Sequence, residues 1–140
     1  MVNFREYVTS SGLRVLGGKS ESNNEELISQ VSPTEIVIHT AQPGSPFVNI
    51  KGAALKRDIK EAAVFCAKYS QDWRDSQRDV FVHVFRGADV YKDRKMKLGT
   101  FGVKKFDVLK IKKEYILKFE KSLREIDDKT KPKGINDETY

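Results

Sequence analysis

The chain has 140 residues, of which 39% are hydrophobic and 33% charged, a composition that predicts one globular domain with a strongly charged surface. No apolar run is long enough to span a bilayer, and the first residues lack the basic and apolar segments of a secretory signal, so we expect a cytoplasmic protein without a membrane partner. The single cysteine, Cys66, excludes an intrachain disulfide.

The net charge of +6 is unevenly distributed along the chain. Residues 1–85 carry ten basic and ten acidic side chains, and residues 114–140 carry six and seven. Residues 86–113 carry ten basic and three acidic side chains, so the whole positive excess lies in this stretch. Such a concentrated basic segment is typical of proteins that bind a nucleic-acid backbone, although a lysine-rich surface that binds nothing has the same composition.

The first quarter of the chain predicts a hairpin followed by a short helix. Residues 4–8 alternate as in a strand, Ser-Ser-Gly at residues 10–12 favours a turn, and residues 13–16 pair back. A helix is predicted to begin with Ser22 as its cap and to end before Pro33.

The middle of the chain predicts two more strands and one long helix. Residues 35–40 and 47–50 are expected to be strands joined by a Pro-Gly-Ser-Pro turn. From Leu55 to Trp73 apolar residues recur at helical spacing, which predicts one amphipathic helix. Cys66 lies on its apolar face, and we interpret it as a small buried side chain rather than a nucleophile.

The last third predicts short strands around a polar loop, then a final helix marked by apolar residues between 115 and 126. The strands are expected at residues 79–86, 90–91, 100–103 and 106–111. Residues 128–140 are polar and predict a flexible tail. We therefore expect residues 1–127 to form a single α+β domain, with two or three helices packed on one face of a mostly antiparallel sheet.

His39 stands at the end of a predicted strand, just before the Pro-Gly-Ser-Pro turn. A catalytic histidine needs a nucleophile and an orienting carboxylate, and Ser45 is not on the strand–turn–helix elbow of hydrolases. A hydrogen bond from His39 to the turn backbone is the simpler interpretation, and contact with a phosphate or base is the alternative. His39 and His83 are the only histidines and no carboxylates cluster at ligand spacing, so we predict no catalytic residue, metal or cofactor.

Two other segments have the composition of a phosphate-binding surface. Lys19, Asn23 and Asn24 stand at the start of a predicted helix, where backbone N–H groups can bind an anion, although the Gly-Gly-Lys turn lacks the spacing of a Walker loop. The basic loop of residues 91–99 can follow a phosphate backbone while Tyr91 stacks on an unpaired base.

These pieces, in this order, resemble the NFACT-R family, the RNA-binding domain of proteins that sense stalled large ribosomal subunits. The resemblance spans residues 4–112 and is carried by Phe4-Arg5, Ser11-Gly12-Leu13, the strand end from Val15 to Lys19, Asn23-Asn24-Glu25-x-Leu27, Glu35-Ile-Val-Ile-His39-Thr, Pro43-Gly-Ser45, Glu61-Ala-Ala63 with Ser70, and Lys92–Lys97 with Gly99. The chain departs from the family pattern at Glu35 and Val37, where an aspartate and a tryptophan are frequent, and at Pro46-Phe47, where the family has a second histidine.

The resemblance implies a non-catalytic module that binds RNA, either tRNA or rRNA, with the ribosome as a further partner; it does not imply that the protein tails nascent chains. Because the chain begins with methionine just before these pieces, we expect a stand-alone version of the domain. The residues predicted to bind RNA are Lys19, Asn23, Asn24, His39, Ser45, Arg86, Lys92, Arg94, Lys95 and Lys97. For them to act together, the loops of residues 17–24, 40–46 and 92–99 must converge at one edge of the sheet.

Three alternatives remain open at this point. DNA is a possible ligand, because charge alone does not distinguish the two sugars. A protein-interaction adaptor in ribosome-associated complexes would use the last helix and the tail to contact its partner. A nuclease or RNA-modifying enzyme would use His39 as its general base, but the sequence shows no paired carboxylates, nucleophile or metal ligands for it.

Overall fold

In the part of the chain that the structure describes, short segments rich in β-branched and other apolar residues pair into one antiparallel sheet of six strands, in the spatial order β1-β2-β4-β3-β5-β8. The computed structural model describes residues 3–130. The strands of the sheet are β1 (Arg5–Val8), β2 (Arg14–Gly17), β3 (Ile36–Thr40), β4 (Val48–Ile50), β5 (Val80–Arg86) and β8 (Asp107–Ile111). The first hairpin and the strands predicted around Pro-Gly-Ser-Pro are thus present.

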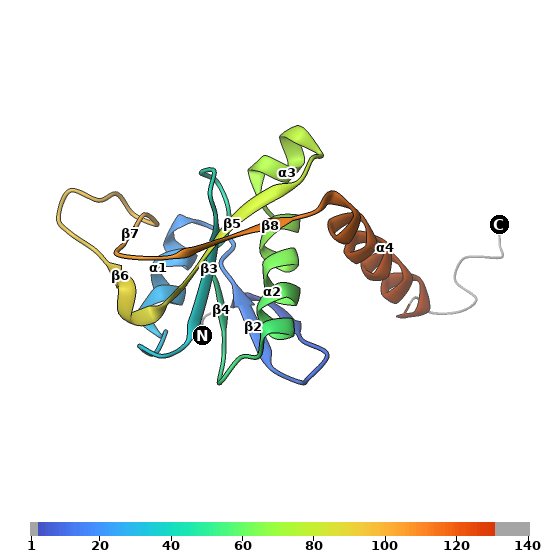
Figure 1. Cartoon of the computed structure of the whole chain (residues 1–140), viewed down its shortest axis with the longest axis horizontal. Helices are drawn as coiled ribbons and strands as arrows, with labels where there is room; N and C mark the ends of the chain where they lie inside the picture. Colours follow the sequence, from blue (N-terminus) through green and yellow to red (C-terminus); the bar gives the residue numbers. More distant parts are fainter. Residues whose placement is uncertain (1–2, 131–140) are drawn as a thin grey trace.

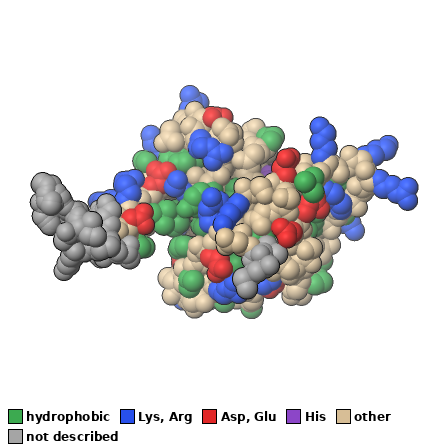
Figure 2. Space-filling model, turned by 180° about the vertical axis from the view of Figure 1, so that it is seen from behind, with side chains coloured by type: hydrophobic (Ala, Val, Ile, Leu, Met, Phe, Trp, Pro, Cys, Tyr) green, Lys and Arg blue, Asp and Glu red, His purple; other side chains and the backbone are tan. Residues whose placement is uncertain are grey.

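Residues 3–130 also form four α-helices and a separate two-stranded ribbon (Figure 1). The helices are α1 (Glu21–Ser29), α2 (Lys56–Lys68), α3 (Gln71–Ser76) and α4 (Lys113–Thr130), and the ribbon pairs β6 (Val90–Tyr91) with β7 (Gly102–Val103). The loop between β6 and β7 projects from one end of the molecule, and α4 lies at the other (Figure 1). Lysine and arginine side chains point outward from the end that carries this loop (Figure 2).

Both faces of the sheet are apolar, and each has its own cover. On one face the side chains of alternate strand residues pack against α2, where Ala62 and Ala63 are fully buried and let the helix approach closely. Trp73 of α3 and Ile116 of α4 join this core. On the opposite face Leu27 of α1 belongs to a second, smaller cluster. The predicted α+β class is confirmed, but the expectation that all helices share one face is wrong for α1.

The predicted helix over residues 55–73 is in fact two helices. Ser70 interrupts it: its hydroxyl donates to the carbonyl of Ala67 at 2.7 Å and accepts the N–H of Trp73 at 3.1 Å, so it caps α3. The apolar spacing continues across the break because Tyr69 and Trp73 still face the core, which is why periodicity alone does not reveal it.

The ends of the first and last helices also differ from the sequence-based expectation. The cap of α1 is Ser20 rather than Ser22, because the hydroxyl of Ser20 accepts the N–H of Asn23. Helix α4 continues to Thr130. The rest of the predicted tail, residues 131–140, lies outside the described residues. Between residues 3 and 130, no helix combines the length and the apolar character needed to cross a bilayer.

Candidate functional site

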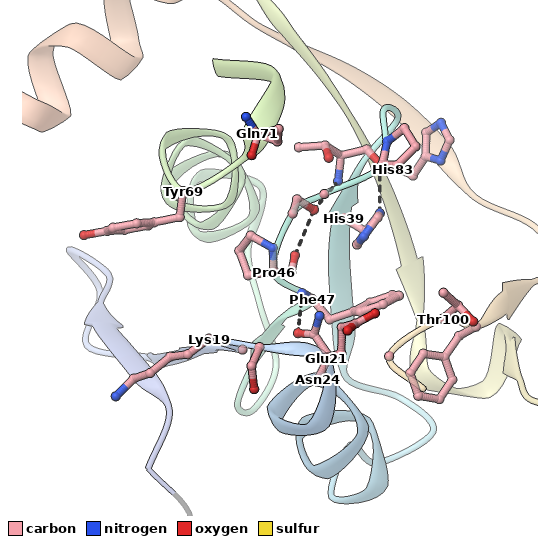
Figure 3. Close-up of a pocket in the computed structure, with 18 of the residues that line it drawn as sticks. Lys19, Glu21, Asn24, His39, Pro46, Phe47, Tyr69, Gln71, His83 and Thr100 are labelled. Atoms are coloured by element: carbon pink, nitrogen blue, oxygen red, sulfur yellow. Dashed lines mark hydrogen bonds between the residues drawn. The ribbon is translucent and has the colours of Figure 1, made fainter. Parts of the chain in front are cut away.

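A cavity of about 640 Å³ opens at the end of the sheet where β3 leads into the Pro-Gly-Ser-Pro turn, between α1 and α3 (Figure 3). Residues 18–21, 39–41, 43–47 and 99–101 line it, so the three loops expected to converge do meet there. The third loop contributes only Gly99 and the residues that follow, and none of its basic side chains.

The predicted binding residues divide into two groups. Those that line the cavity are Lys19, Asn24, His39 and Ser45. Those that do not are Asn23, Arg86, Lys92, Arg94, Lys95 and Lys97. Arg86 pairs in register with Ile36 at the start of β3, which places it at the opposite end of the strands from the cavity. The sequence therefore groups residues that the fold places at three different locations.

The Pro-Gly-Ser-Pro turn is held by its own hydrogen bonds. The hydroxyl of Ser45 accepts the N–H of Thr40 at 3.1 Å and donates to the carbonyl of Pro46 at 3.1 Å. Gly44 has a positive φ of 88°, and its carbonyl accepts the N–H of Gln71 at 2.7 Å, which fixes the turn to the start of α3. Ser45 therefore stabilises the turn, and its hydroxyl proton is not directed at a ligand.

His39 is a neutral side chain in the cavity wall. Its Nδ1 lies 2.8 Å from the carbonyl of Thr40, and because a carbonyl can only accept, Nδ1 carries the proton and Nε2 is an acceptor. Burial against its neighbours, including Phe47 at a ring distance of 4.3 Å, lowers the pKa of His39 from 6.5 to about 4. His39 thus bonds to the backbone at the last residue of β3 rather than within the turn, and an uncharged imidazole offers no positive charge to a phosphate.

The two asparagines at the start of α1 have different surroundings. The side-chain oxygen of Asn23 accepts the N–H of Lys19 at 2.9 Å and so shapes the preceding loop. Asn24 is buried, and its side-chain oxygen accepts the N–H of Phe47 at 3.0 Å. In the described part of the chain the Nδ2 group of Asn24 has no hydrogen-bond acceptor. Asn24 therefore places a free N–H donor in the cavity wall.

Gly18 is predicted to be intolerant of substitution because Asn24 lies against it. A Cβ atom at Gly18 would lie 1.9 Å from Oδ1 of Asn24 and 3.3 Å from its Cα, so Gly18→Ala must displace the side chain that bonds to Phe47. We expect a loss of about 1–3 kcal/mol in the free energy of unfolding, measured by urea denaturation. In an Asn24→Ala background the same change should be much less destabilising. Equal losses in both backgrounds would contradict the assigned clash.

The basic loop is attached to α1 through Lys92. The ammonium of Lys92 donates to Glu25 at 2.5 Å and to the carbonyls of Lys97 and Thr100 at 2.6 and 2.8 Å. The same Glu25 oxygen accepts the N–H of Gly99 at 2.7 Å. The hydrogen bond from Lys92 lowers the pKa of the Glu25 carboxyl. Lys92 therefore closes the loop, and its charge is already compensated.

The remaining cations of this loop are free. Arg94, Lys95 and Lys97 are exposed, and within residues 3–130 none of them forms an ion pair. Because Lys92 and Gly99 hold both ends of the loop to α1, these three charges are carried on a segment of fixed position that projects beyond the cavity (Figures 1 and 2).

Sequence reasoning missed several residues at the cavity mouth. The guanidinium of Arg5 lies 3.9 Å from the ring centre of Tyr69, and Arg74 donates to the side chain of Gln71 at 2.9 Å and to the carbonyl of Tyr69 at 3.4 Å. With Lys19, these arginines give the mouth three cations, next to the carboxylate of Glu21. Only the strand pairing that brings β1 beside β2, and the helix break at Ser70, place them there.

The cavity combines aromatic, polar and charged groups in its wall. Its inner wall carries the aromatic rings of Phe47 and Phe101, packed edge to face at 5.3 Å. In the described residues, no three His, Cys, Asp or Glu side chains are grouped so that they could hold a metal ion. Cys66 is fully buried, which raises its pKa to about 12, as expected of a packing residue. The site therefore combines cations at its mouth with aromatic and hydrogen-bonding groups inside. Its volume suits a small chemical group.

Comparison with known proteins shows the fold and the family of this chain. The solved structure of the C-terminal part of the fibronectin/fibrinogen-binding protein from Streptococcus suis is similar, with a TM-score of 0.72 at 20% sequence identity, covering 83% of this chain and 48% of that one. The chain thus spans about half of that structure, and the likeness shows the fold. No curated protein matches the chain significantly. The NFACT protein RNA binding domain matches residues 3–105, which contribute every strand except β8 and all the residues that line the cavity, so this chain belongs to the NFACT RNA-binding domain family.

Proposed function

We propose that this chain is a non-catalytic RNA-binding module that uses the cavity and the basic loop together. The observation that carries the proposal is the composition of the cavity mouth, where Arg5, Lys19 and Arg74 surround an opening lined inside by aromatic rings. Cations at the mouth suit phosphates, and aromatic walls suit an unpaired base. The family to which the chain belongs supports RNA as the ligand.

Two groups inside the cavity would select the bound nucleotide. Nδ2 of Asn24 is a hydrogen-bond donor, and Nε2 of His39 is an acceptor because Nδ1 holds the proton. A ribose 2′-hydroxyl can donate to such an acceptor, and a deoxyribose has no equivalent group. We therefore expect RNA to bind more tightly than DNA of the same sequence. Equal affinities for RNA and DNA would mean that the site does not distinguish the two sugars. DNA would then remain a possible ligand, or the interaction would be purely electrostatic.

The family resemblance further favours an RNA of the translation machinery, tRNA or rRNA, and a cytoplasmic, ribosome-associated role in translation quality control. The alternative of an enzyme with His39 as general base has little support, since an imidazole with a pKa of about 4 is a weak base at neutral pH. Crosslinking to RNA in cells, followed by sequencing of the bound fragments, tests this finer assignment. Fragments that do not come from tRNA or rRNA would contradict it.

The exposed cations of the basic loop are predicted to contribute to the salt dependence of RNA binding. Replacing Arg94, Lys95 and Lys97 with glutamine should lower the slope of log Kd against log salt by about 2, because each phosphate neutralised on a single strand contributes about 0.7. Lys92 is left unchanged, since it holds the loop to Glu25. The measurement is fluorescence anisotropy of a labelled RNA over a series of salt concentrations.

A matched control has the same loss of charge elsewhere. Lys118, Lys121 and Arg124 are exposed on α4, away from the cavity, and their replacement with glutamine removes three positive charges as well. This variant should keep the wild-type slope. If both triple variants lower the slope equally, net charge rather than the loop determines RNA binding, and the role assigned to the loop is wrong.

A further inference from the structure

The outer part of the sheet, formed by β5 and the edge strand β8, exposes large apolar side chains on the face that carries α1. Phe81 is 47% exposed, Phe106 46% and Val108 55%. In the register Phe81 lies opposite Lys110 and His83 opposite Val108, so these side chains share one face. Leu109 and Ile111 point to the other face and pack in the main core.

The charge around this surface is strongly positive. Residues 104–113 contain five lysines and a single acidic residue, Asp107. Lys110 lies on the same face as Phe81 and has a loose, exposed contact with Asp79 at 3.8 Å. Within residues 3–130 the other four lysines form no ion pair. Aromatic rings bordered by unpaired lysines are complementary to a polyanion with flat bases, and less so to an apolar protein surface.

The surface is continuous with the cavity through His83. The ring of His83 stacks on Phe106, with ring centres 3.9 Å apart and planes 23° from parallel. His83 also lines the cavity and lies directly opposite His39 in the register of β3 and β5. A strand of RNA that enters the cavity at His39 would therefore pass next over Phe106. Phe106, Val108 and Lys110 lie beyond the residues matched by the family, 3–105.

We propose that the β5–β8 face is a second contact surface for single-stranded RNA, on which bases stack against Phe106 and Phe81 while the neighbouring lysines contact phosphates. The proposal rests on the proposed function, because it extends the RNA path out of the cavity. Stacking requires exposed ring faces and unpaired bases, so the surface should bind single strands and not duplexes.

The test replaces both rings with leucine, which keeps apolar bulk at exposed positions and removes the flat π face. Kd is measured by anisotropy for an unpaired RNA of about 12 nucleotides and for a duplex of the same length. F81L/F106L should raise the Kd for the single strand about fivefold or more, the range expected for the loss of base stacking, and leave the Kd for the duplex unchanged. The control is Tyr115→Leu, which removes an exposed aromatic ring from α4.

A direct readout accompanies the affinity. 2-Aminopurine is quenched when it stacks on an aromatic ring, and it is placed in turn at each position of the single strand. The wild type should quench it at more positions than F81L/F106L, which keeps only the quenching caused by the aromatic rings inside the cavity. Wild-type protein that binds no RNA would overturn the proposed function together with this proposal. RNA binding by the wild type with an unchanged Kd for F81L/F106L would overturn this proposal alone. An equal loss for duplex and single strand would also overturn it.

Discussion

Replacing Trp73 with alanine is expected to lower the free energy of unfolding by about 3–5 kcal/mol, the range for removing a large aromatic side chain from a core. Trp73 is only 2% exposed and packs in the main core from α3. Its Nε1 donates to Glu120 at 2.9 Å, so the ring also joins α3 to α4. Urea denaturation of the wild type and the variant measures the loss.

The same substitution should weaken RNA binding under conditions in which the variant remains folded. Helix α3 places Gln71 and Arg74 at the cavity mouth, and Trp73 is its only buried residue. Trp73→Phe is the control, since it keeps a ring in the core and loses the hydrogen bond to Glu120. It should be destabilising by only about 1–2 kcal/mol. A variant Trp73→Ala as stable as Trp73→Phe would show that the core closes around the missing ring.

The order of strands and helices could be predicted because it depends on local patterns. The β-branched and aromatic runs of β3 and β5, and the helical spacing of apolar residues in α2, are visible within a few residues of sequence. The two-sided cover of the sheet was missed, because the helices were expected on one face, although adjacent apolar residues within one strand indicate it. Val15 and Leu16 are adjacent in β2 and both buried, which requires apolar packing on both faces.

The cavity could be predicted only in part, because its residues meet through long-range contacts. Lys19 and Asn24 lie on either side of the start of α1, and His39 and Ser45 lie on either side of the end of β3, so local helix-start and turn signals indicate both pairs. Arg5 and Tyr69 are far apart in the chain, and no local pattern indicates that a guanidinium will lie over that ring. Composition likewise counts Lys92 as one more positive charge, although Glu25, 67 residues away in sequence, compensates it.

The pKa of His39 likewise cannot be predicted from local sequence, and it makes the stability of the fold depend on pH. The sequence places an imidazole at a strand end, but its pKa depends on burial by residues that the fold brings together. In the folded chain this pKa is about 4, against 6.5 for an exposed histidine. Between these values the unfolded chain binds a proton that the folded chain does not, so stability must rise with pH across this interval.

We therefore expect His39 alone to reduce the free energy of unfolding by about 2 kcal/mol between pH 7 and pH 5, a loss that approaches about 3 kcal/mol below pH 4. The interval above pH 5 is the informative one, because the carboxyl groups of Glu25, Glu35 and Glu61, whose pKa values are lowered, stay ionised there.

His39→Asn is the matched variant, since its amide can still donate to the carbonyl of Thr40 but does not titrate. Its unfolding free energy, from urea curves at each pH, should fall much less between pH 7 and pH 5 than that of the wild type. His83, whose pKa burial also lowers, leaves a residual slope in both proteins. Equal slopes for the two proteins would mean that folded His39 takes up its proton near pH 6.5. The imidazole would then be charged when RNA binds under mildly acidic conditions, and the acceptor role of Nε2 would be lost there.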